Sequence, residues 1–165
     1  MPMVTPRVPR IARTLNGWMG SSTGPRFVPQ AHRWLYESTR GRLGHGIIGV
    51  PVLLLLTTGR RSGLRRAVAL VYGRDGESLV VVASNYGGDR DPAWLGNIRA
   101  DPRVEVCVGR RRVHALARVV GPEDADHRRL FALMNRINRD RYVQYQTRTA
   151  RPIHLVVLVP GAGAG

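Results

Sequence analysis

The sequence predicts a small α+β protein that is mainly β: an antiparallel barrel of about six strands, with two or three helices in the connections. Three observations predict this class. Short apolar runs end in turn residues at intervals that suit hairpins. Neither strand–helix–strand alternation nor a GxGxxG motif is present in the sequence. A length of 165 residues suits one compact domain better than two.

Six segments carry the strand signal, which is a run of β-branched or other apolar residues bounded by turn residues. They are residues 52–58, 67–72, 79–83, 103–108, 113–120 and 153–159. The first ends at Gly59, and Arg74-Asp75-Gly76-Glu77 is typical of a hairpin turn between the second and third. The fourth alternates valines with other residues and turns tightly at 109–112 into the fifth. Neighbouring strands are therefore expected to be antiparallel.

Two helices are expected between these strands. The first begins at Asp91-Pro92, where Asp91 suits the N-cap and Pro92 the first helical position, and it ends at Asp101-Pro102. The second opens at residues 121–124, which would give it an acidic first turn that suits the helix dipole. Its apolar side is expected to consist of Leu130, Phe131, Met134 and Ile137.

Residues 1–45 differ from the rest because they carry seven arginines against one acidic residue. We expect a basic N-terminal arm with short helices there, a barrel domain at 46–160 and a disordered tail at 161–165. The spacing of Ile11, Leu15 and Trp18 is that of a short amphipathic helix that can lie on an anionic membrane surface. A flexible leader or a helix packed on the barrel is the plainer interpretation.

Charge is the most unusual feature of the composition. The 26 basic residues, all arginine, exceed the 11 acidic ones and give a formal net charge of +15. This excess suggests an anionic partner, although codon bias in a GC-rich genome can produce it unaided. Cys107 is the one cysteine and the five histidines lack ligand spacing, so we expect no disulfide and no metal site. A cytoplasmic location is expected, since no signal-peptide pattern or long apolar span is seen.

The segment from Thr57 to Arg66 is the strongest candidate for a ligand-binding site. It places two glycines, three hydroxyl residues and four arginines in a connection between strands. Arginine offers bidentate, charge-assisted hydrogen bonds to phosphate and carboxylate groups, so the segment can bind an anionic tail. The alternative is a solvated hairpin turn in an arginine-rich chain. The same alternative is favoured for the triple arginine at 110–112, which otherwise suggests nucleic-acid binding.

Two further segments are weaker candidates. Residues 85–90 follow a strand directly, and their paired glycines would let a flat ligand or a phosphate approach the backbone. An ordinary flexible loop explains them as well. Tyr142 and Tyr145 share a helical face and can cover an aromatic cofactor, although tyrosines at this spacing are more often packing residues.

Taken in order, several segments resemble one enzyme family, the deazaflavin-dependent nitroreductases and F420H2-dependent quinone reductases. The resembling segments are residues 52–63 and 81–85, then Pro92-Ala93-Trp94 with Asn97 and Asp101-Pro102, then 145–149 with Arg151-Pro152-Ile153. The likeness extends from about residue 35 to residue 160. It implies an actinobacterial enzyme with a split β-barrel similar to FMN-binding barrels and with coenzyme F420, an 8-hydroxy-5-deazaflavin.

The resemblance also implies a set of site residues. It assigns the phosphate and the glutamate-bearing tail of the coenzyme to Arg60, Arg61, Ser62, Gly63, Leu64 and Arg66. It assigns the surroundings of the phosphate, ribityl chain and ring to Val82, Ala83, Ser84, Asn85, Ala93, Trp94 and Asn97. The catalytic residues are then Ser84, which would hydrogen-bond the developing anion on the acceptor, with Tyr142 and Tyr145, which would pack on the acceptor or help to deliver a proton.

This chain also departs from the family pattern. Val71 and Arg139 stand where the best-studied nitroreductase type has pocket tyrosines, and Leu64 replaces a polar residue of the tail-binding segment. These departures bear on which acceptor is used, and in particular on whether nitro compounds are reduced. They bear less on coenzyme binding, because the arginines and the Ser84-Asn85 pair are present.

The expected activity is hydride transfer from reduced F420 to a quinone-like, nitro-aromatic or activated-alkene acceptor. Two alternatives stay open: an FMN- or haem-binding split barrel, and a non-enzymatic basic module for nucleic acid or a membrane surface. In the enzymatic interpretation the chain binds no nucleic acid and is a monomer. Its N-terminal arm would then make peripheral contact with the inner face of the cell membrane.

Overall fold

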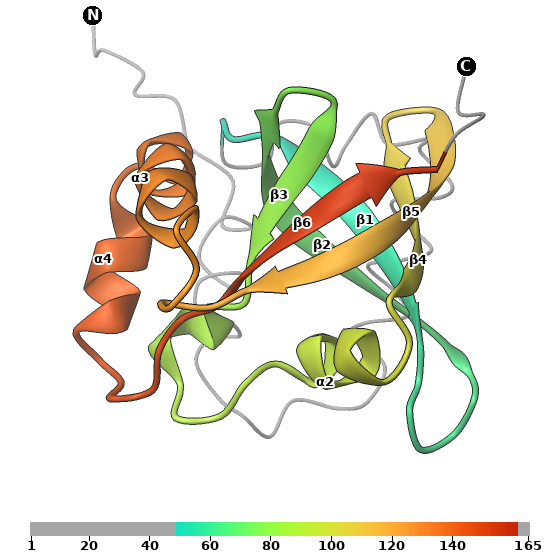
Figure 1. Ribbon diagram of the computed structural model, residues 1–165, viewed down its shortest axis with the longest axis horizontal. Helices are drawn as coiled ribbons and strands as arrows, with labels where there is room; N and C mark the ends of the chain where they lie inside the picture. Colours follow the sequence, from blue (N-terminus) through green and yellow to red (C-terminus); the bar gives the residue numbers. More distant parts are fainter. Residues whose placement is uncertain (1–48, 162–165) are drawn as a thin grey trace, which may run out of the picture.

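The computed structural model describes residues 49–161, which form a closed antiparallel barrel (Figure 1). The strands are β1 (Val52–Thr58), β2 (Arg65–Asp75), β3 (Ser78–Val82), β4 (Arg103–Val108), β5 (Arg111–Val120) and β6 (Leu155–Pro160). Around the barrel they follow the order β1-β2-β3-β6-β5-β4, and each neighbouring pair is antiparallel. The predicted fold class is confirmed.

All six predicted strands are present, but some of their ends differ. β2 begins at Arg65, two residues before the predicted start, because Arg65 and Arg66 pair with Thr58 and Thr57 of β1. β6 begins at Leu155, two residues after its predicted start. The longer β2 has a consequence for the site, since it places Arg66 on a regular strand and leaves only residues 59–64 to form the β1–β2 bend.

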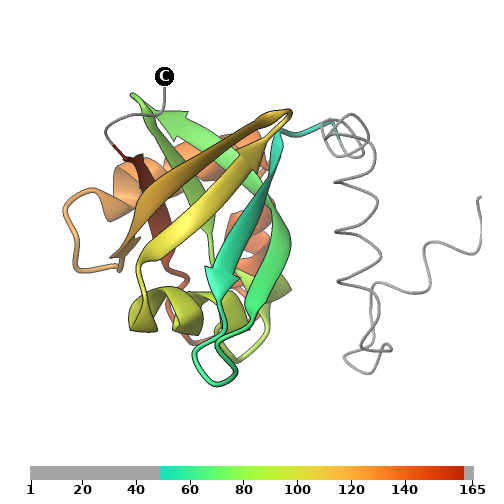
Figure 2. The same ribbon diagram turned by 90° about the vertical axis from the view of Figure 1, so that its right-hand side faces the viewer.

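Helix α2 (Ala93–Ala100) closes one end of the barrel (Figures 1 and 2). Its predicted N-cap is wrong by one residue: Pro92 is the N-cap, in an extended conformation, and no side chain caps the helix. The Asp91 carboxylate instead pairs with Arg99 at 2.8 Å and with Arg151 at 3.0 Å. Two charged partners therefore take the acceptor that a capping bond would have used.

Helices α3 (His127–Ile137) and α4 (Arg141–Gln146) lie outside the barrel, with α3 against β2, β3 and β6 (Figure 1). The predicted start of α3 at residues 121–124 is wrong, because these residues form a turn and the first helical turn holds no acidic residue. The Gly121 N–H donates to the Asp124 carboxylate at 2.8 Å, so this carboxylate closes the turn instead of facing the helix dipole.

The apolar core has two main layers, both fully buried. Inside the barrel lie Leu53, Leu55, Val81, Val106 and Leu158, capped by Trp94, Leu95 and Ile98 of α2. Between the outer face of β3 and β6 and the two outer helices lie Val80, Val82, Leu155 and Val157, against Leu130, Met134 and Tyr142. Phe131 and Ile137 pack on this second layer, which confirms the predicted apolar side of α3.

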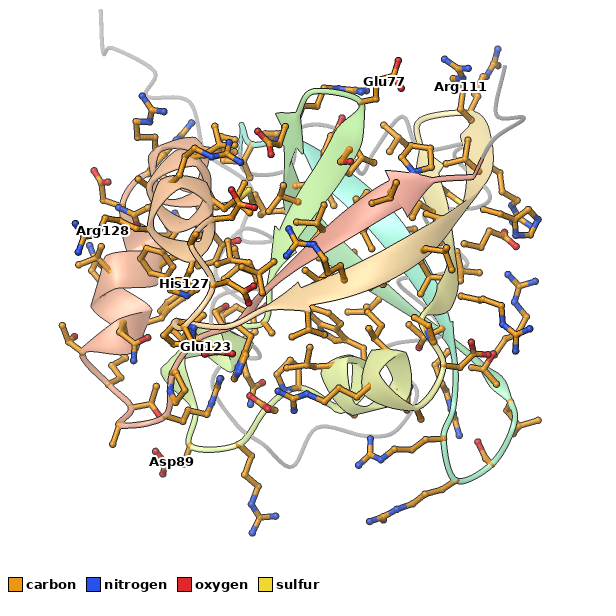
Figure 3. The ribbon with its side chains drawn as sticks, in the orientation of Figure 1. Glu77, Asp89, Arg111, Glu123, His127 and Arg128 are labelled. Atoms are coloured by element: carbon orange, nitrogen blue, oxygen red, sulfur yellow. The ribbon has the colours of Figure 1, made fainter. Side chains whose placement is uncertain are left out.

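The two ends of the barrel differ in what they carry. Figure 3 shows Glu77 and Arg111 at the β2–β3 and β4–β5 turns, and Asp89 at the opposite end, where α2 lies. Of the triple arginine at 110–112, Arg110 lies in the exposed turn, and Arg111 and Arg112 are the exposed first residues of β5. Any function of that turn is therefore separate from the α2 end, where both the β1–β2 bend and the loop before α2 lie (Figures 1 and 3).

The arm predicted at residues 1–45 and most of the tail predicted at 161–165 lie outside the described residues, so the structure does not test these two predictions. Within residues 49–161, no helix combines the length and the apolar character needed to span a bilayer.

Candidate functional site

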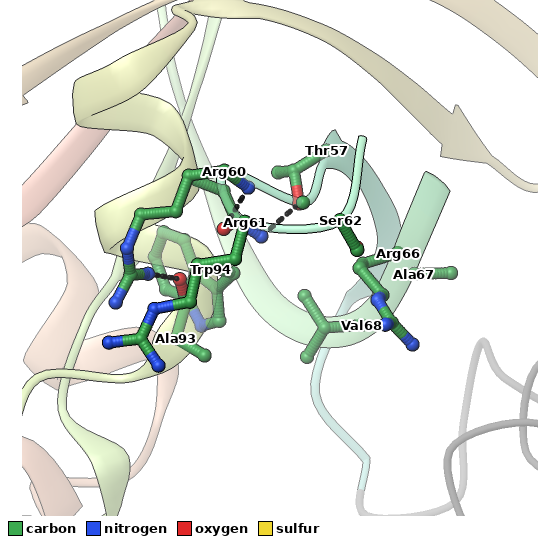
Figure 4. Close-up of a pocket in the computed structure, with 11 residues that line it drawn as sticks. Thr57, Arg60, Arg61, Ser62, Arg66, Ala67, Val68, Ala93 and Trp94 are labelled. Atoms are coloured by element: carbon green, nitrogen blue, oxygen red, sulfur yellow. Dashed lines mark hydrogen bonds between the residues drawn. The ribbon is translucent and has the colours of Figure 1, made fainter. Parts of the chain in front are cut away.

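The α2 end of the barrel holds a cleft of about 490 Å³ between the β1–β2 bend and α2 (Figure 4). We call it the arginine cleft; it is lined by Thr57, Gly59, Arg60, Arg61, Ser62, Arg66, Ala67, Val68, Ala93, Trp94 and Asn97. Its volume lies within the range of about 300–1,000 Å³ that is usual for small-molecule sites. Three of the lining side chains are arginines and none is acidic, so the cleft suits an anionic ligand.

The bend at residues 59–64 is closed by its own backbone. The Gly63 N–H donates to the Gly59 carbonyl at 2.7 Å, and the Gly59 N–H donates to the Leu64 carbonyl at 2.8 Å. A Cβ at Gly59 would lie 2.8 Å from the Ser62 hydroxyl oxygen and 3.1 Å from the Leu64 carbonyl oxygen, so a larger residue would crowd the bend. Gly63 and Leu64, which were predicted to contact the coenzyme, shape the turn and do not line the cleft; Leu64 is 61% exposed.

Asn97 of α2 holds the bend and the strand before it. Its Oδ1 accepts a hydrogen bond from the Arg60 backbone N–H at 3.1 Å, and its Nδ2 donates to the Thr57 hydroxyl at 3.1 Å. The Asn97 and Thr57 side chains are both buried, so neither group has water as an easy substitute. Asn97 lines the cleft as predicted, and in addition it positions the bend.

The three cleft arginines differ in their partners. The Arg60 guanidinium donates to the Ala93 carbonyl at 3.1 Å, and any side chain at Gly96 would collide with it. The side chains of Arg61 and Arg66 have no hydrogen-bond or ion-pair partner within the described part of the chain. Their side chains lie on opposite sides of the cleft, Arg61 beside α2 and Arg66 beside Ala67 (Figure 4). Two guanidinium groups are therefore available to a ligand.

Arg65 takes no part in the cleft. It pairs with the carboxylate of Glu105 on β4, and Arg112 of β5 pairs with the same carboxylate at 2.8 Å. The Glu105 side chain is largely buried between them. This carboxylate therefore neutralises arginines outside the cleft and leaves the charges of Arg61 and Arg66 unopposed.

The other predicted coenzyme residues, Val82, Ala83, Ser84 and Asn85, lie at the end of β3 and do not line the cleft. Val82 ends β3, and the other three open the loop of residues 83–91, which we call the Ser84 loop and which leads into α2. Ser84 is buried, whereas Asn85 is exposed. The loop and the β1–β2 bend that lines the arginine cleft lie at the same end of the barrel, on either side of α2 (Figure 1).

Arg151 clamps the Ser84 loop. Its guanidinium donates to the Ser84 carbonyl at 2.7 Å, the Ala83 carbonyl at 3.3 Å and the Gly88 carbonyl at 2.9 Å, and it pairs with Asp91 at 3.0 Å. Only 13% of its side chain is exposed. A guanidinium fork with this many acceptors fixes the backbone on both sides of Ser84.

The Ser84 loop stores backbone strain. Asn85 and Tyr86 both have left-handed conformations, with φ of 45° and 55°. Such conformations cost about 1–2 kcal/mol for residues other than glycine and persist where the surroundings enforce them. Gly87 also has a positive φ, and a Cβ there would lie 2.6 Å from the Tyr145 carbonyl oxygen. This glycine, expected to let a ligand approach, instead lets the loop approach α4.

Three tyrosines form a row from the core to the surface, which we call the tyrosine row. Tyr142 is 4% exposed. Its burial raises the pKa of the phenol above the ordinary value, and the neighbouring Tyr145 and Tyr86 raise it further. The Tyr145 ring lies edge-on to Tyr142 at 6.1 Å between centroids and edge-on to Tyr86 at 5.9 Å. Tyr86 is the outermost ring, at 73% exposed.

Sequence reasoning missed two of these groups. Arg151 belongs to a segment that carries the family resemblance, but one arginine among 26 basic residues gives no sign that it is an internal clamp. Tyr86 lies in a segment that was singled out for its glycines, and the one signal available was an aromatic residue directly after the Ser84-Asn85 pair. Both roles depend on contacts between distant parts of the chain.

A closed antiparallel barrel with a cleft that is lined by arginines and by no acidic residue defines a class of small barrel proteins suited to an anionic ligand. A family model described as F420H(2)-dependent quinone reductase matches residues 28–160. A protein named F420H(2)-dependent quinone reductase from Mycobacterium tuberculosis is 41% identical over 145 residues, 87% of this chain and 97% of the relative. The chain therefore belongs to the F420H(2)-dependent quinone reductase family.

Solved structures agree with this assignment. The structure of F420-H2 dependent reductase FDR-A is 30% identical and covers 66% of this chain and 93% of its own, with a TM-score of 0.58. A structure described as a domain-swapped dimer is 28% identical and covers 78% and 98%, with a TM-score of 0.60. The haem storage protein HutZ from Vibrio cholerae shares the fold alone. It is 15% identical and covers 84% of this chain and 93% of its own, with a TM-score of 0.51.

Proposed function

We propose that this protein transfers a hydride from reduced F420 to a quinone and that the arginine cleft holds the anionic tail of the coenzyme. Membership of the family makes the protein an F420H2-dependent oxidoreductase with F420 as its cofactor. The observation that carries the site assignment is the pair of guanidinium groups of Arg61 and Arg66, which lie on opposite sides of a cleft without a carboxylate and have no partner among residues 49–161.

The residues of the cleft fit such a coenzyme. Phosphate and carboxylate groups of the tail match the planar donor forks of Arg61 and Arg66. The cleft floor continues into apolar lining from Ala67, Val68 and Trp94, on which a flat ring system can rest. Because Arg60 is held by Asn97 and Ala93, the bend keeps its shape before the ligand arrives, and less ordering entropy is lost on binding.

In the proposed mechanism the chain orients the reactants. When bound, reduced F420 supplies the hydride. Ser84, held in place by the Arg151 clamp, donates a hydrogen bond to the acceptor oxygen that gains negative charge. Tyr145 packs on the acceptor, and Tyr142 supports it from beneath. The raised pKa of Tyr142 keeps its phenol protonated, which favours an orienting role over proton delivery.

Nitro-aromatic compounds and activated alkenes remain further proposed acceptors. Val71 packs partly buried on the cluster that contains Leu130, and Arg139 donates to the Gly49 carbonyl at 3.5 Å. These two positions, where the resemblance expects pocket tyrosines, therefore offer an aliphatic side chain and a charged one. We expect this change to favour quinones over nitro compounds.

The test of tail binding uses the two free arginines. Oxidised F420 is titrated by fluorescence into the wild type and into an Arg61→Ala, Arg66→Ala double variant. Each lost charge-assisted hydrogen bond at a partly exposed site costs about 1.5 kcal/mol, so the Kd should rise by roughly 100-fold. Added salt should weaken wild-type binding and have less effect on the variant.

The matched control removes two arginines at the opposite end of the barrel, Arg110→Ala with Arg111→Ala, and should change the Kd by less than about threefold. An equal loss in both double variants would show that only net charge matters.

The alternative functions have their own signatures. A yellow or red purified protein that does not bind F420 would favour FMN or haem. Co-purifying nucleic acid that resists high salt would favour the non-enzymatic alternative.

Three further statements about location, assembly and membrane contact are proposals. They are that the protein acts in the cytoplasm of an actinobacterium, that it works as a monomer without nucleic acid, and that its basic N-terminal arm contacts the inner face of the membrane. A quinone acceptor supports the last of these, because many quinones are dissolved in the bilayer.

A further inference from the structure

We infer that Tyr86 is a further acceptor-contacting residue, whose exposed ring forms the outer wall on which the flat ring of the quinone stacks. The inference rests on the proposed function, because it concerns the acceptor of the same reaction. It adds to the two predicted tyrosines a third, on the Ser84 loop, and it defines the class of acceptor as a planar, conjugated ring.

The tyrosine row leaves Tyr86 as its most exposed ring. Tyr142 is buried in the second core layer. The Arg148 guanidinium lies over the Tyr145 ring, 5.5 Å from its centroid, and Tyr145 makes T-shaped contacts with the other two tyrosines. Tyr86 has Tyr145 as its one aromatic contact among the described residues and is 73% exposed. A ligand ring that stacks on this row therefore meets Tyr86 first.

The backbone that presents Tyr86 is held in a costly conformation. Asn85 and Tyr86 are left-handed, and the Arg151 clamp and the close contact of Gly87 with α4 enforce that shape. Strain of this kind is concentrated at ligand sites, where it fixes a side chain in advance.

Tyr86 also lies on the same short turn as the proposed anion-stabilising group. The Gly87 N–H donates to the Ser84 carbonyl at 2.9 Å and closes a four-residue turn that begins at Ser84. The turn thus combines a hydroxyl for a carbonyl oxygen of the acceptor with an aromatic face for its ring. A quinone has both features, since its oxygens lie in the plane of a conjugated ring.

The test compares Tyr86→Ala with Tyr86→Phe and with Leu116→Ala, which removes an exposed apolar side chain from β5. A water-soluble naphthoquinone serves as acceptor in turnover and as ligand in a direct titration of intrinsic fluorescence without coenzyme. Loss of one aromatic contact should raise the quinone KM and the quinone Kd about three- to tenfold in Tyr86→Ala. The kcat and the F420 Kd should stay within about twofold, and the two other variants should match the wild type.

Several results would overturn the inference. An unchanged quinone KM and Kd in Tyr86→Ala would remove Tyr86 from the acceptor site. A parallel rise in the F420 Kd would place it against the coenzyme, and a change in oligomeric state or in binding to anionic lipid vesicles would make it an interface residue. The titration without coenzyme separates this inference from the proposed function, because quinone binding can depend on Tyr86 even if the arginine cleft does not bind F420.

Discussion

The arginine cleft and the Ser84 loop use the same type of residue in opposite ways. Arg61 and Arg66 are exposed and have no partner among the described residues. Arg151 is 13% exposed, and its guanidinium donates to carbonyls of the Ser84 loop and pairs with Asp91. A guanidinium has five N–H donors, and their partners decide whether it binds a ligand or organises the protein.

The comparison teaches how to find a site in a strongly basic chain. With 26 basic residues, neither the number of arginines nor their clustering separates a binding residue from a solvated one. An acceptor within the fold, such as the Ala93 carbonyl for Arg60 or Glu105 for Arg65, marks an arginine whose donors are already engaged. Arginines that lack such an acceptor and also line one cleft without a carboxylate, as Arg61 and Arg66 do, identify the surface that an anion can occupy.

The largest effect on stability is expected from Arg151→Ala. The substitution leaves backbone carbonyls of the Ser84 loop without their donor and Asp91 with one partner fewer, so the free energy of unfolding should fall by about 2–4 kcal/mol. Urea denaturation measures this loss. Turnover with a quinone should fall more steeply than F420 affinity, because Ser84 lies on the clamped loop and outside the arginine cleft.

The control for this variant is Arg90→Ala, which removes an exposed arginine from the same loop and should change stability by less than about 0.5 kcal/mol. Arg151→Lys should recover only part of the loss, because an ammonium group cannot reach all these acceptors at once. If Arg151→Ala and Arg90→Ala unfold at the same urea concentration, the clamp has no energetic importance and the comparison between the two regions fails.

A smaller effect is expected where the cleft depends on a buried amide. Asn97→Ala removes the partners of the Arg60 backbone N–H and of the Thr57 hydroxyl, at a cost of about 1–3 kcal/mol in unfolding free energy. The bend is then less ordered, so the F420 Kd should also rise severalfold. Thr57→Val breaks only the second bond and should leave F420 binding close to wild type. Equal changes in Kd would show that Asn97 acts through the strand instead of the bend.

The smallest effect concerns an arginine outside both regions. Arg129 of α3 forms a two-pronged pair with Asp75 at 2.6 and 2.9 Å and holds the pKa of that carboxyl below its usual value. The stabilisation is present above the pKa of the unfolded chain, about 4, and is lost as pH falls through the lower folded pKa. Between pH 7 and pH 3, the Tm of the wild type should therefore fall more than that of Asp75→Asn. Parallel melting curves would rule out this contribution.

The strands and the core were predictable because their signals are local. The alternation of Val104, Val106 and Val108 and the Asp75-Gly76 turn specify strand faces and hairpins within a few residues. The helix starts were predicted wrongly for the opposite reason. The carboxylates of Asp91 and Asp124 had the right positions for capping or for the dipole, but Arg151, Arg99 and the Gly121 N–H compete for them.

The candidate site was predictable only as a set of segments. The order and spacing of the motifs identified the family and the arginine-rich bend, and seven of the predicted coenzyme residues line the cleft: Arg60, Arg61, Ser62, Arg66, Ala93, Trp94 and Asn97. The predicted ring-side residues at 82–85 lie beside it instead. Nothing in the pattern of Asn85-Tyr86-Gly87-Gly88 showed that its first glycine faces α4 while its tyrosine faces solvent.

The sequence alone therefore determined the barrel, its coenzyme class and the segments that carry the chemistry, because apolar periodicity, turn residues and motif order are properties of neighbouring positions. The tertiary structure decided which arginines bind and which ones clamp, and which tyrosine is exposed. The physical reason is that a donor's role depends on the acceptor it meets, and here those acceptors lie far away in the chain: Asn97 is 37 residues from Arg60, and Ser84 is 67 residues from Arg151.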